Sequence, residues 1–202
     1  MILLIGTKNQ NKISEISAIL RDFDVEVKSL QDFPEVSDVE ETGKTFEENA
    51  KLKAEAWAKA TGLVTIADDS GLCVDALSGA PGVYSARFAG VDKDFDANNR
   101  KLLEEMREVR EDFRHAHFIT VIACATPETG TVFTAEGRVD GKITHELRGE
   151  NGFGYDPLFM YPPEGKTFAE IPAEMKNSVS HRFRAIEAFK VKFIEHFLSK
   201  EN

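Results

Sequence analysis

The sequence contains little cysteine, no long apolar run and no excess of positive charge, and each of these absences narrows the class of protein. Cys73 and Cys124 belong to no CxxC pattern; two free thiols favour a reducing compartment, although counting leaves a single disulfide open. No stretch approaches the ~20 apolar residues that span a membrane. The formal net charge of -10 repels a polyanion, which argues against broad nucleic-acid binding.

The apolar segment 1–5 is short and lacks the basic residues of a signal peptide, so we expect a core strand and a cytoplasmic protein. A chain of 202 residues fits one large domain or two small lobes that share a sheet. Such a chain buries roughly 70% of the surface that it exposes when unfolded. The negative charge still permits a small phosphorylated substrate, and a divalent cation would then offset the repulsion between acids and phosphates.

The most unusual stretch is Ala67–Gly71, in which two adjacent aspartates follow an apolar run at 63–66. We expect a strand that ends at Asp68 and Asp69, which places acid groups at a sheet edge where α/β folds bind ligands. Consecutive strand residues point to opposite faces, so a turn at 70–71 would be needed to bring both carboxylates together. A simple Asx-turn that ends the strand is the alternative reading.

The N-terminal region predicts a strand at 1–5, a polar turn at 6–12 and a helix whose apolar stripe begins at Ile13. Such a loop offers backbone N–H groups and the positive end of a helix, which suit an anion. Lys8 and Lys12 add positive charge there. An ordinary turn with solvated lysines remains the alternative, because the loop lacks the glycines of known phosphate fingerprints.

Gly43-Lys44-Thr45 is not a P-loop, because Asp38 stands where the first glycine of that motif belongs. Thr45 and Glu48 instead form a capping box, which predicts a helix to about residue 60 that ends at Gly62. Lys53 lies beside the apolar stripe of this helix, where a lysine is more often a solvated or snorkelling residue than a ligand.

Further along, the periodicity predicts a strand at 25–27, a helix at 96–109 and strands at 117–125 and 131–139. A last helix would begin after Ser180 as N-cap, with a buried stripe formed by Ile186, Phe189, Phe193, Ile194 and Phe197. His115 and His117 lie two residues apart, but we do not expect a zinc site, since no further ligands follow at metal spacing.

The segment 149–157 alternates glycines with Phe153 and Tyr155. Aromatic rings stack on nucleobases, so this loop is a candidate base-binding segment; the alternative is that its rings fill the core. Polar donors gather at 176–182, before the last helix, and suit an anion or a carbonyl-rich ring.

Taken together, these segments resemble the inosine/xanthosine triphosphate pyrophosphatases, which remove non-standard purine nucleotides. The resemblance runs from Thr7 to about Ala185. Four blocks carry it in order: residues 7–12; residues 41–43 with 45–50; residues 67–90, which contain Gly79-Ala80-Pro81-Gly82-Val83-Tyr84-Ser85-Ala86-Arg87-Phe88; and residues 152–157 followed by Ser180-His181-Arg182. One departure is Lys8, where this family often has glycine.

The resemblance implies an α/β fold with a mixed elongated sheet flanked by helices, in one domain (1–202) of two lobes with a groove between them. It also implies a homodimer and Mg²⁺-dependent cleavage of dITP, ITP, XTP or dXTP to the monophosphate and pyrophosphate. The carried-over roles are Glu41 and Asp69 for the metal, with Asp69 activating water; Thr7, Lys8, Asn9, Gln10, Asn11, Lys12, Lys53 and Ser70 for the phosphates; and Phe153, Gly154, Tyr155, Asp156, Lys176, His181 and Arg182 for the base.

The physical chemistry agrees with these roles. A triphosphate carries several negative charges, which lysines and a metal must offset, and carboxylates are hard oxygen ligands that suit Mg²⁺. A nucleotide-binding protein without turnover, or a metal-dependent phosphomonoesterase, are the rival readings; the chain lacks the DxDx[TV] motif that would support the second. Tyr84, Phe88 and Phe95 belong either to a dimer face or to the core.

Overall fold

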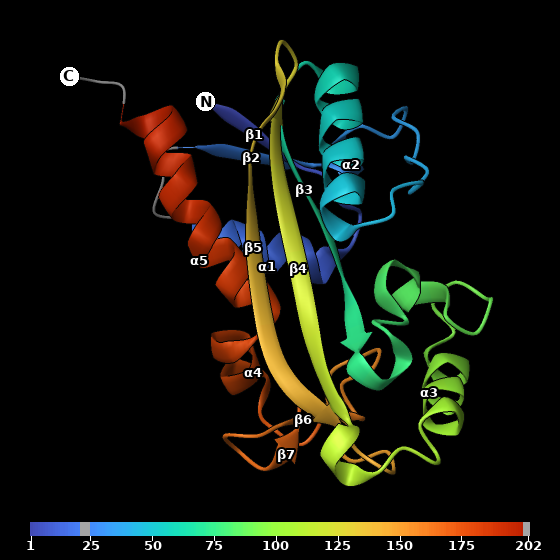
Figure 1. Ribbon diagram of the computed structural model, residues 1–202. Helices are drawn as coiled ribbons and strands as arrows, with labels where there is room; N and C mark the ends of the chain where they lie inside the picture. The colour runs from blue at the N-terminus through green and yellow to red at the C-terminus, as the bar shows by residue number, and fades with distance from the viewer. Residues whose placement is uncertain (21–24, 200–202) are drawn as a thin grey trace. The chain divides into compact units, whose positions relative to one another are not determined.

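The computed structural model describes residues 1–20 and 25–199, and for Asn11, Glu15, Ala18 and Ile19 it describes the backbone alone. Its strands are β1 (Ile2–Ile5), β2 (Glu26–Ser29), β3 (Val64–Val74), β4 (His115–Thr126), β5 (Gly130–Ile143), β6 (Phe159–Tyr161) and β7 (Lys166–Thr167). Its α-helices are α1 (Gln10–Leu20), α2 (Phe46–Thr61), α3 (Phe95–Glu105), α4 (Ala173–Val179) and α5 (His181–Phe193), joined by shorter helical turns (Figure 1).

Within the described residues, seven strands form one sheet in the order β2-β1-β3-β4-β5-β6-β7. β1 pairs in parallel with β2 and β3, whereas β6 pairs antiparallel with β5 and β7, so the sheet is mixed as expected. Helices flank the strands, and the chain is an α/β protein. No helix of the described part is long and apolar enough to cross a membrane.

The chain divides into two compact units, each with a core of its own. Unit 1 comprises Met1–Asp69, Val121–Glu136 and Ala185–Asn202, and unit 2 comprises Ser70–Thr120 and Gly137–Arg184. The core of unit 1 includes Leu3, Ile66, Ile122, Phe189 and Phe193, and that of unit 2 includes Leu72, Leu102, Phe118, Phe159 and Phe168. The predicted single groove between two lobes stays a prediction, and each unit is described by itself below.

Local sequence signals explain most helix ends. Thr45 and Glu48 form the predicted capping box of α2, and Gly62 closes that helix in the left-handed conformation at φ 70°. The hydroxyl of Ser180 accepts a hydrogen bond from the amide of Phe183 at 3.2 Å, which confirms the predicted cap of α5. The stripe of α5 was wrong in one position, because Ile194 is 41% exposed.

Three other predicted elements differ in length. The helix expected at 96–109 ends at Glu105, where the chain turns, and α4 was not predicted at all. β4 and β5 both extend beyond the predicted ranges, to His115–Thr126 and Gly130–Ile143. Strand pairing is set by neighbouring strands as well as by local propensity, so strand ends are the part that the sequence pattern predicts least well.

Candidate active site

The two adjacent aspartates lie inside β3 and not at its end. β3 continues through residues 68–71 to Val74, so the predicted strand end and turn at Ser70-Gly71 are wrong. The strand that ends at this point is β1, because its register with β3 ends at Ile5↔Ile66. Asp68 and Asp69 therefore lie just past the carboxyl end of β1, which is where α/β folds place ligands.

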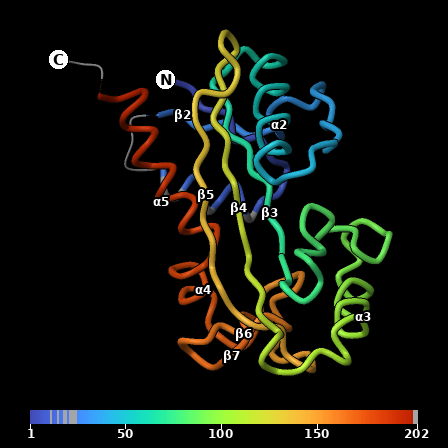
Figure 2. Tube along the Cα trace, in the orientation of Figure 1, coloured from blue at the N-terminus to red at the C-terminus, as the bar shows by residue number. Residues whose placement is uncertain are grey.

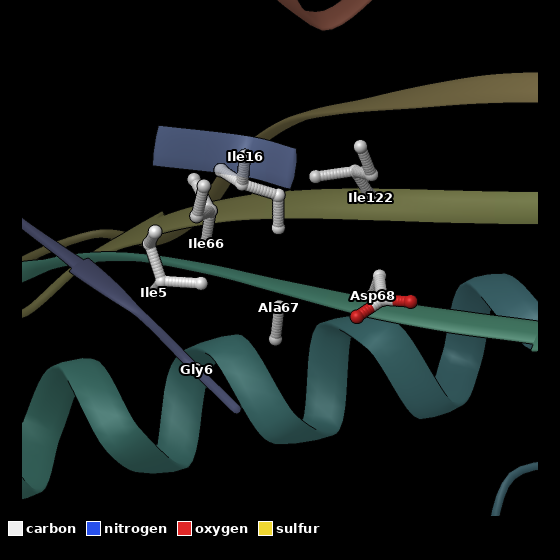
Figure 3. Close-up of a pocket in the computed structure, with 7 residues that line it drawn as sticks. All are labelled: Ile5, Gly6, Ile16, Ile66, Ala67, Asp68 and Ile122. Atoms are coloured by element: carbon white, nitrogen blue, oxygen red, sulfur yellow. The ribbon is translucent and has the colours of Figure 1, made fainter. Parts of the chain in front are cut away.

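The two carboxylates face opposite sides of the strand, as the pleat requires. Asp68 Oδ2 accepts a hydrogen bond from Lys12 Nζ in α1 at 2.6 Å. Asp69 Oδ2 accepts one from Asn49 Nδ2 in α2 at 3.1 Å. In Figure 3, α1 and α2 run on opposite sides of β3. Asp68 is one of the residues that line the small pocket drawn there. Isoleucines mainly line that pocket, so it does not suit a phosphate chain.

Lys53 is the cation shared by two acids of unit 1. Its ammonium lies 2.7 Å from Glu41 Oε1 and 3.5 Å from Asp69 Oδ1. Only 8% of Lys53 is exposed, so the interpretation as a solvated lysine is wrong. A buried lysine of this kind is retained where carboxylates hold its charge, because an unpaired buried ammonium is costly.

The charge states of this cluster depend on one another. Burial raises the pKa of the Asp69 carboxyl above its ordinary value near 3.8, and the charges of Glu41 and Asp68 act in the same direction against Lys53 and Asn49. Burial alone would lower the pKa of Lys53, but Asp69, Asp68 and Glu41 together raise it above its ordinary value of 10.5. The cluster therefore favours the charged form of Lys53 and disfavours the charged form of Asp69. Shifted pKa values of this kind are typical of a functional site.

The loop after β1 and the first turn of α1, which begins at Gln10, contain the predicted phosphate residues 7–12. The amide of Asn9 donates to Thr7 Oγ1 at 3.1 Å, and the amide of Lys12 donates to Asn9 Oδ1 at 3.4 Å. Lys8 pairs with the exposed Asp38 at 2.7 Å and not with the aspartates of β3. The side chain of Lys12 reaches the acidic cluster through its bond to Asp68.

Gln10 and Asn11 follow in the first turn of α1. Gln10 Oε1 accepts a hydrogen bond from Gln31 Nε2 at 3.3 Å, and the side chain of Asn11 lies outside the described residues. Gly6 begins the loop at a point of close approach, since an added Cβ would lie 2.6 Å from Trp57 and 2.9 Å from the carbonyl of Ile66. Ser70 follows Asp69 in β3 and is half-buried.

In unit 2, a second buried carboxylate organises the glycine-rich loop. Asp156 pairs with Lys176 of α4 and accepts a hydrogen bond from the amide of Phe153 at 2.8 Å. The Lys176 ammonium also lies 5.0 Å from the centre of the Phe153 ring, whose side chain is 47% exposed. Gly152 has φ 76°, which suits glycine at this turn.

The two aromatic residues of this loop have different environments. Tyr155 is buried and donates its hydroxyl to the carbonyl of Ser85 at 2.9 Å, and burial raises its pKa well above 10.0. For Tyr155 the core alternative is therefore correct, whereas Phe153 presents its ring to solvent. Asn99 of α3 holds the loop from outside by donating to the carbonyl of Gly154 at 2.9 Å.

His181 and Arg182 begin α5. The His181 ring stacks on Phe118 at 4.8 Å with an interplanar angle of 15°, and the residue is 8% exposed. Arg182 is half-buried beside it. The structure thus brings Phe153, Asp156 and Lys176 into direct contact. His181 lies in the same unit, at the start of α5.

Glu41 and Asp69 are the residues of unit 1 that could hold a divalent metal. Among the described residues no group of three or more histidines, cysteines, aspartates or glutamates is close enough to hold an ion. Glu41 and Asp69 nevertheless both direct an oxygen at one cation, the Lys53 ammonium. Mg²⁺ needs only one or two protein carboxylates when phosphates and water supply the rest, so these oxygens fit it.

The structure adds detail on three aromatic residues and on the two cysteines. Tyr84 is 60% exposed and Phe95 37% exposed, whereas Phe88 packs partly into the core of unit 2. Both cysteines are free, and burial raises the pKa of Cys124 to about 12.

Asn49 is the residue that sequence reasoning missed. It is 1% exposed and touches Asp69. The signal was present, because Asn49 precedes Lys53 by four residues and so shares its helix face.

Comparisons with known proteins agree on one family. The sequence model of the Ham1 family matches residues 3–192. A dITP/XTP pyrophosphatase of Listeria monocytogenes is 52% identical over 193 residues, which cover 96% of this chain and 95% of that protein. The solved structure of the Staphylococcus aureus Ham1 protein is 44% identical and superposes with a TM-score of 0.89, over 96% of this chain and 98% of that one.

A third relative is the nucleoside-triphosphatase, dITP/XTP pyrophosphatase, of Mycobacterium abscessus. Its crystal structure is 44% identical with a TM-score of 0.81, and it covers 94% of this chain and 98% of that one.

Proposed function

The chain belongs to the Ham1 family, and from this premise we propose that it hydrolyses dITP, ITP and XTP or dXTP to the monophosphate and pyrophosphate. Its relatives from Listeria monocytogenes and Mycobacterium abscessus are dITP/XTP pyrophosphatases that match this chain over nearly their whole length. The observation that carries the proposal is the cluster of Asp68, Asp69 and Glu41 with Lys12 and Lys53 past the end of β1. That combination of acids and lysines suits a metal-bound phosphate chain.

In this proposal Glu41 and Asp69 hold Mg²⁺, which supplies charge neutralisation and a Lewis acid at the phosphates. Asp69 orients the attacking water and accepts its proton, a role that its raised pKa favours. The water oxygen bonds to the α-phosphorus, and the bond from that phosphorus to the bridging oxygen of the β-phosphate breaks. Lys12 and Lys53 stabilise the negative charge on the departing pyrophosphate.

The remaining phosphate contacts come from residues 7–12 and Ser70. Residues 7–12 follow the carboxyl end of β1 and enter the N-terminus of α1, a place that favours anions. Lys8 would leave its exposed partner Asp38 to reach the nucleotide, which costs little because an exposed ion pair is weak.

The base is assigned to unit 2. Phe153 offers an exposed ring for stacking, with Gly154 and the buried Tyr155 shaping its loop and Asp156 and Lys176 fixing it. His181 and Arg182 are the donors proposed for the 6-oxo group. Adenine has an amino group at this position and would leave those donors unpaired, at a cost of about 1–3 kcal/mol for each buried group.

The test is a pyrophosphate-release assay with dITP, XTP, GTP and ATP in the presence of Mg²⁺. We expect release from dITP and XTP that EDTA abolishes. Binding of dITP without turnover would favour a sensor protein, and release of orthophosphate would favour a phosphomonoesterase. We also propose that the protein is a homodimer and cytoplasmic. Light scattering of the purified protein would test the homodimer.

A further inference from the structure

The segment that carries Glu41 has no regular secondary structure, yet it is fixed to α2 at three consecutive amides. The amide of Gly43 donates to Asn49 Oδ1 at 2.8 Å. The amides of Lys44 and Thr45 both donate to Glu48 Oε2, at 2.6 and 3.2 Å. The start of α2 therefore determines where Glu41 lies, two residues before the first of these bonds.

Asn49 also reaches the other proposed metal ligand. Its Nδ2 donates to Asp69 Oδ2 at 3.1 Å, and the residue is 1% exposed. The amide orientation follows from the network, because the Gly43 N–H needs an acceptor and the Asp69 carboxylate needs a donor. One buried side chain thus contacts the segment of Glu41 with its oxygen and Asp69 with its nitrogen.

Gly43 is matched to this contact. A Cβ added at Gly43 would lie 2.6 Å from Asn49 Oδ1 and 2.7 Å from Glu48 Cβ. The close approach of the segment to Asn49 therefore requires glycine at position 43 for space and not for backbone freedom.

We propose that Asn49 is a positioning residue that sets the separation and orientation of the Glu41 and Asp69 carboxylates for the metal. This inference rests on the proposed function, in which those two residues are the metal ligands. Aspartate, which has the same shape, could not replace it, since it would present only acceptors to Asp69. Outer-shell partners of this kind typically change metal affinity by about 10–100-fold when they are removed.

The experiment measures Mn²⁺ binding to the full-length protein by electron paramagnetic resonance in the presence of a non-hydrolysable α,β-imido analogue of dITP, with the analogue alone as the blank, because the phosphates supply part of the metal's ligands. We expect Asn49→Ala to weaken Mn²⁺ binding by about 10–100-fold and to raise the Mg²⁺ concentration needed for half-maximal dITP turnover. Gly43→Ala leaves the amide of Asn49 in place and should weaken Mn²⁺ binding by about 10-fold, because only the segment of Glu41 is displaced.

Asn98→Ala is the matched control. Asn98 is also 1% exposed, accepts from the amide of Ala89 at 2.7 Å and donates to the carbonyl of Ala86 at 3.1 Å, within unit 2. A purely structural role for Asn49 predicts that both alanine variants lose stability alike and that both keep Mn²⁺ affinity. Our proposal requires that the Asn49 and Gly43 variants lose Mn²⁺ affinity and that the Asn98 variant keeps it.

Mn²⁺ affinity of Asn49→Ala and Gly43→Ala within about twofold of the wild type would overturn the inference, even if the wild type releases pyrophosphate as proposed. If the wild type binds Mn²⁺ but releases no pyrophosphate, the proposed reaction fails, while the two variants still decide the role of Asn49. Absence of Mn²⁺ binding to the wild type would overturn both. If Asn49→Ala does not fold, Gly43→Ala carries the decision.

Discussion

Each compact unit buries an aspartate against a lysine, but the two pairs differ in their surroundings. In unit 1, Asp69 shares Lys53 with Glu41, and the pKa of Asp69 is raised by burial and by the nearby acids. In unit 2, Asp156 has Lys176 of α4 and the amide of Phe153 in its own loop as partners. An excess of acid over cation around a buried ion pair is therefore a more useful signal of catalytic chemistry than the pair itself.

Asp69→Asn gives the largest expected effect and tests the functional side of this comparison. The amide cannot accept the proton of the attacking water, so turnover of dITP should fall about 10³-fold or more. The free energy of unfolding should stay level or rise by about 1 kcal/mol, because a strained buried charge is removed. Pyrophosphate release and urea unfolding check the two halves; near-normal turnover would move the catalytic role to another residue.

Asp156→Ala tests the structural side. Removing the carboxylate leaves the Lys176 ammonium without its partner and the amide of Phe153 without its acceptor, so we expect a loss of about 3 kcal/mol of unfolding free energy. Asp140→Ala, which removes the partner of Arg138 in an exposed pair of unit 2, is the control and should change little. Loss of turnover without loss of stability at Asp156 would erase the contrast between the two pairs.

The pH dependence of stability sharpens the same contrast. The native state holds the Asp69 proton more tightly than the unfolded chain does, because its pKa is raised above 3.8. The stability associated with that proton is lost as the pH rises from about 3.8 through the raised pKa. The unfolding free energy of Asp69→Asn should thus gain on that of the wild type over this interval, measured in urea with EDTA. A constant difference would contradict a raised pKa.

Thr45→Ala has the smallest expected effect of the four. It removes the cap of the helix that carries Asn49 and Lys53, at a cost of about 1 kcal/mol of unfolding free energy. Thr45→Ser keeps the hydroxyl and should retain most of that stability in the same denaturation experiment. A much larger loss of turnover than of stability in Thr45→Ala would mean that the cap acts on the acidic cluster and not only on the helix.

Sequence patterns predicted what local chemistry decides. The capping box of α2, its end at Gly62 and the cap at Ser180 all depend on residues within four positions of one another, and all three are confirmed. The path of β3 through Asp68 and Asp69 could not be predicted in this way. It depends on β1 and β4 as neighbours in the sheet, and the turn propensity of Asp-Ser-Gly yields to that pairing.

The same distinction applies to the site. Asp69 and Glu41 were proposed from residue type and resemblance. Lys53 was proposed from the resemblance for the phosphates, but its burial between these two acids was not predicted, because a lysine in an amphipathic helix is usually solvated. Burial of Lys53 follows from two carboxylates that approach from different segments, which no local window contains. Asn49 was missed for the same reason, since its two partners lie on either side of it in the sequence, at Gly43 and Asp69.

The division into two units has a consequence for how this chain can be cut. The boundaries fall at Asp69–Ser70, Thr120–Val121, Glu136–Gly137 and Arg184–Ala185, and each lies inside a regular element and not in a linker. Figure 2 follows the continuous trace through these elements, β3, β4, β5 and α5. Each unit is assembled from separate segments of the chain, so no contiguous fragment consists of one unit alone, and neither unit can be isolated by a single truncation.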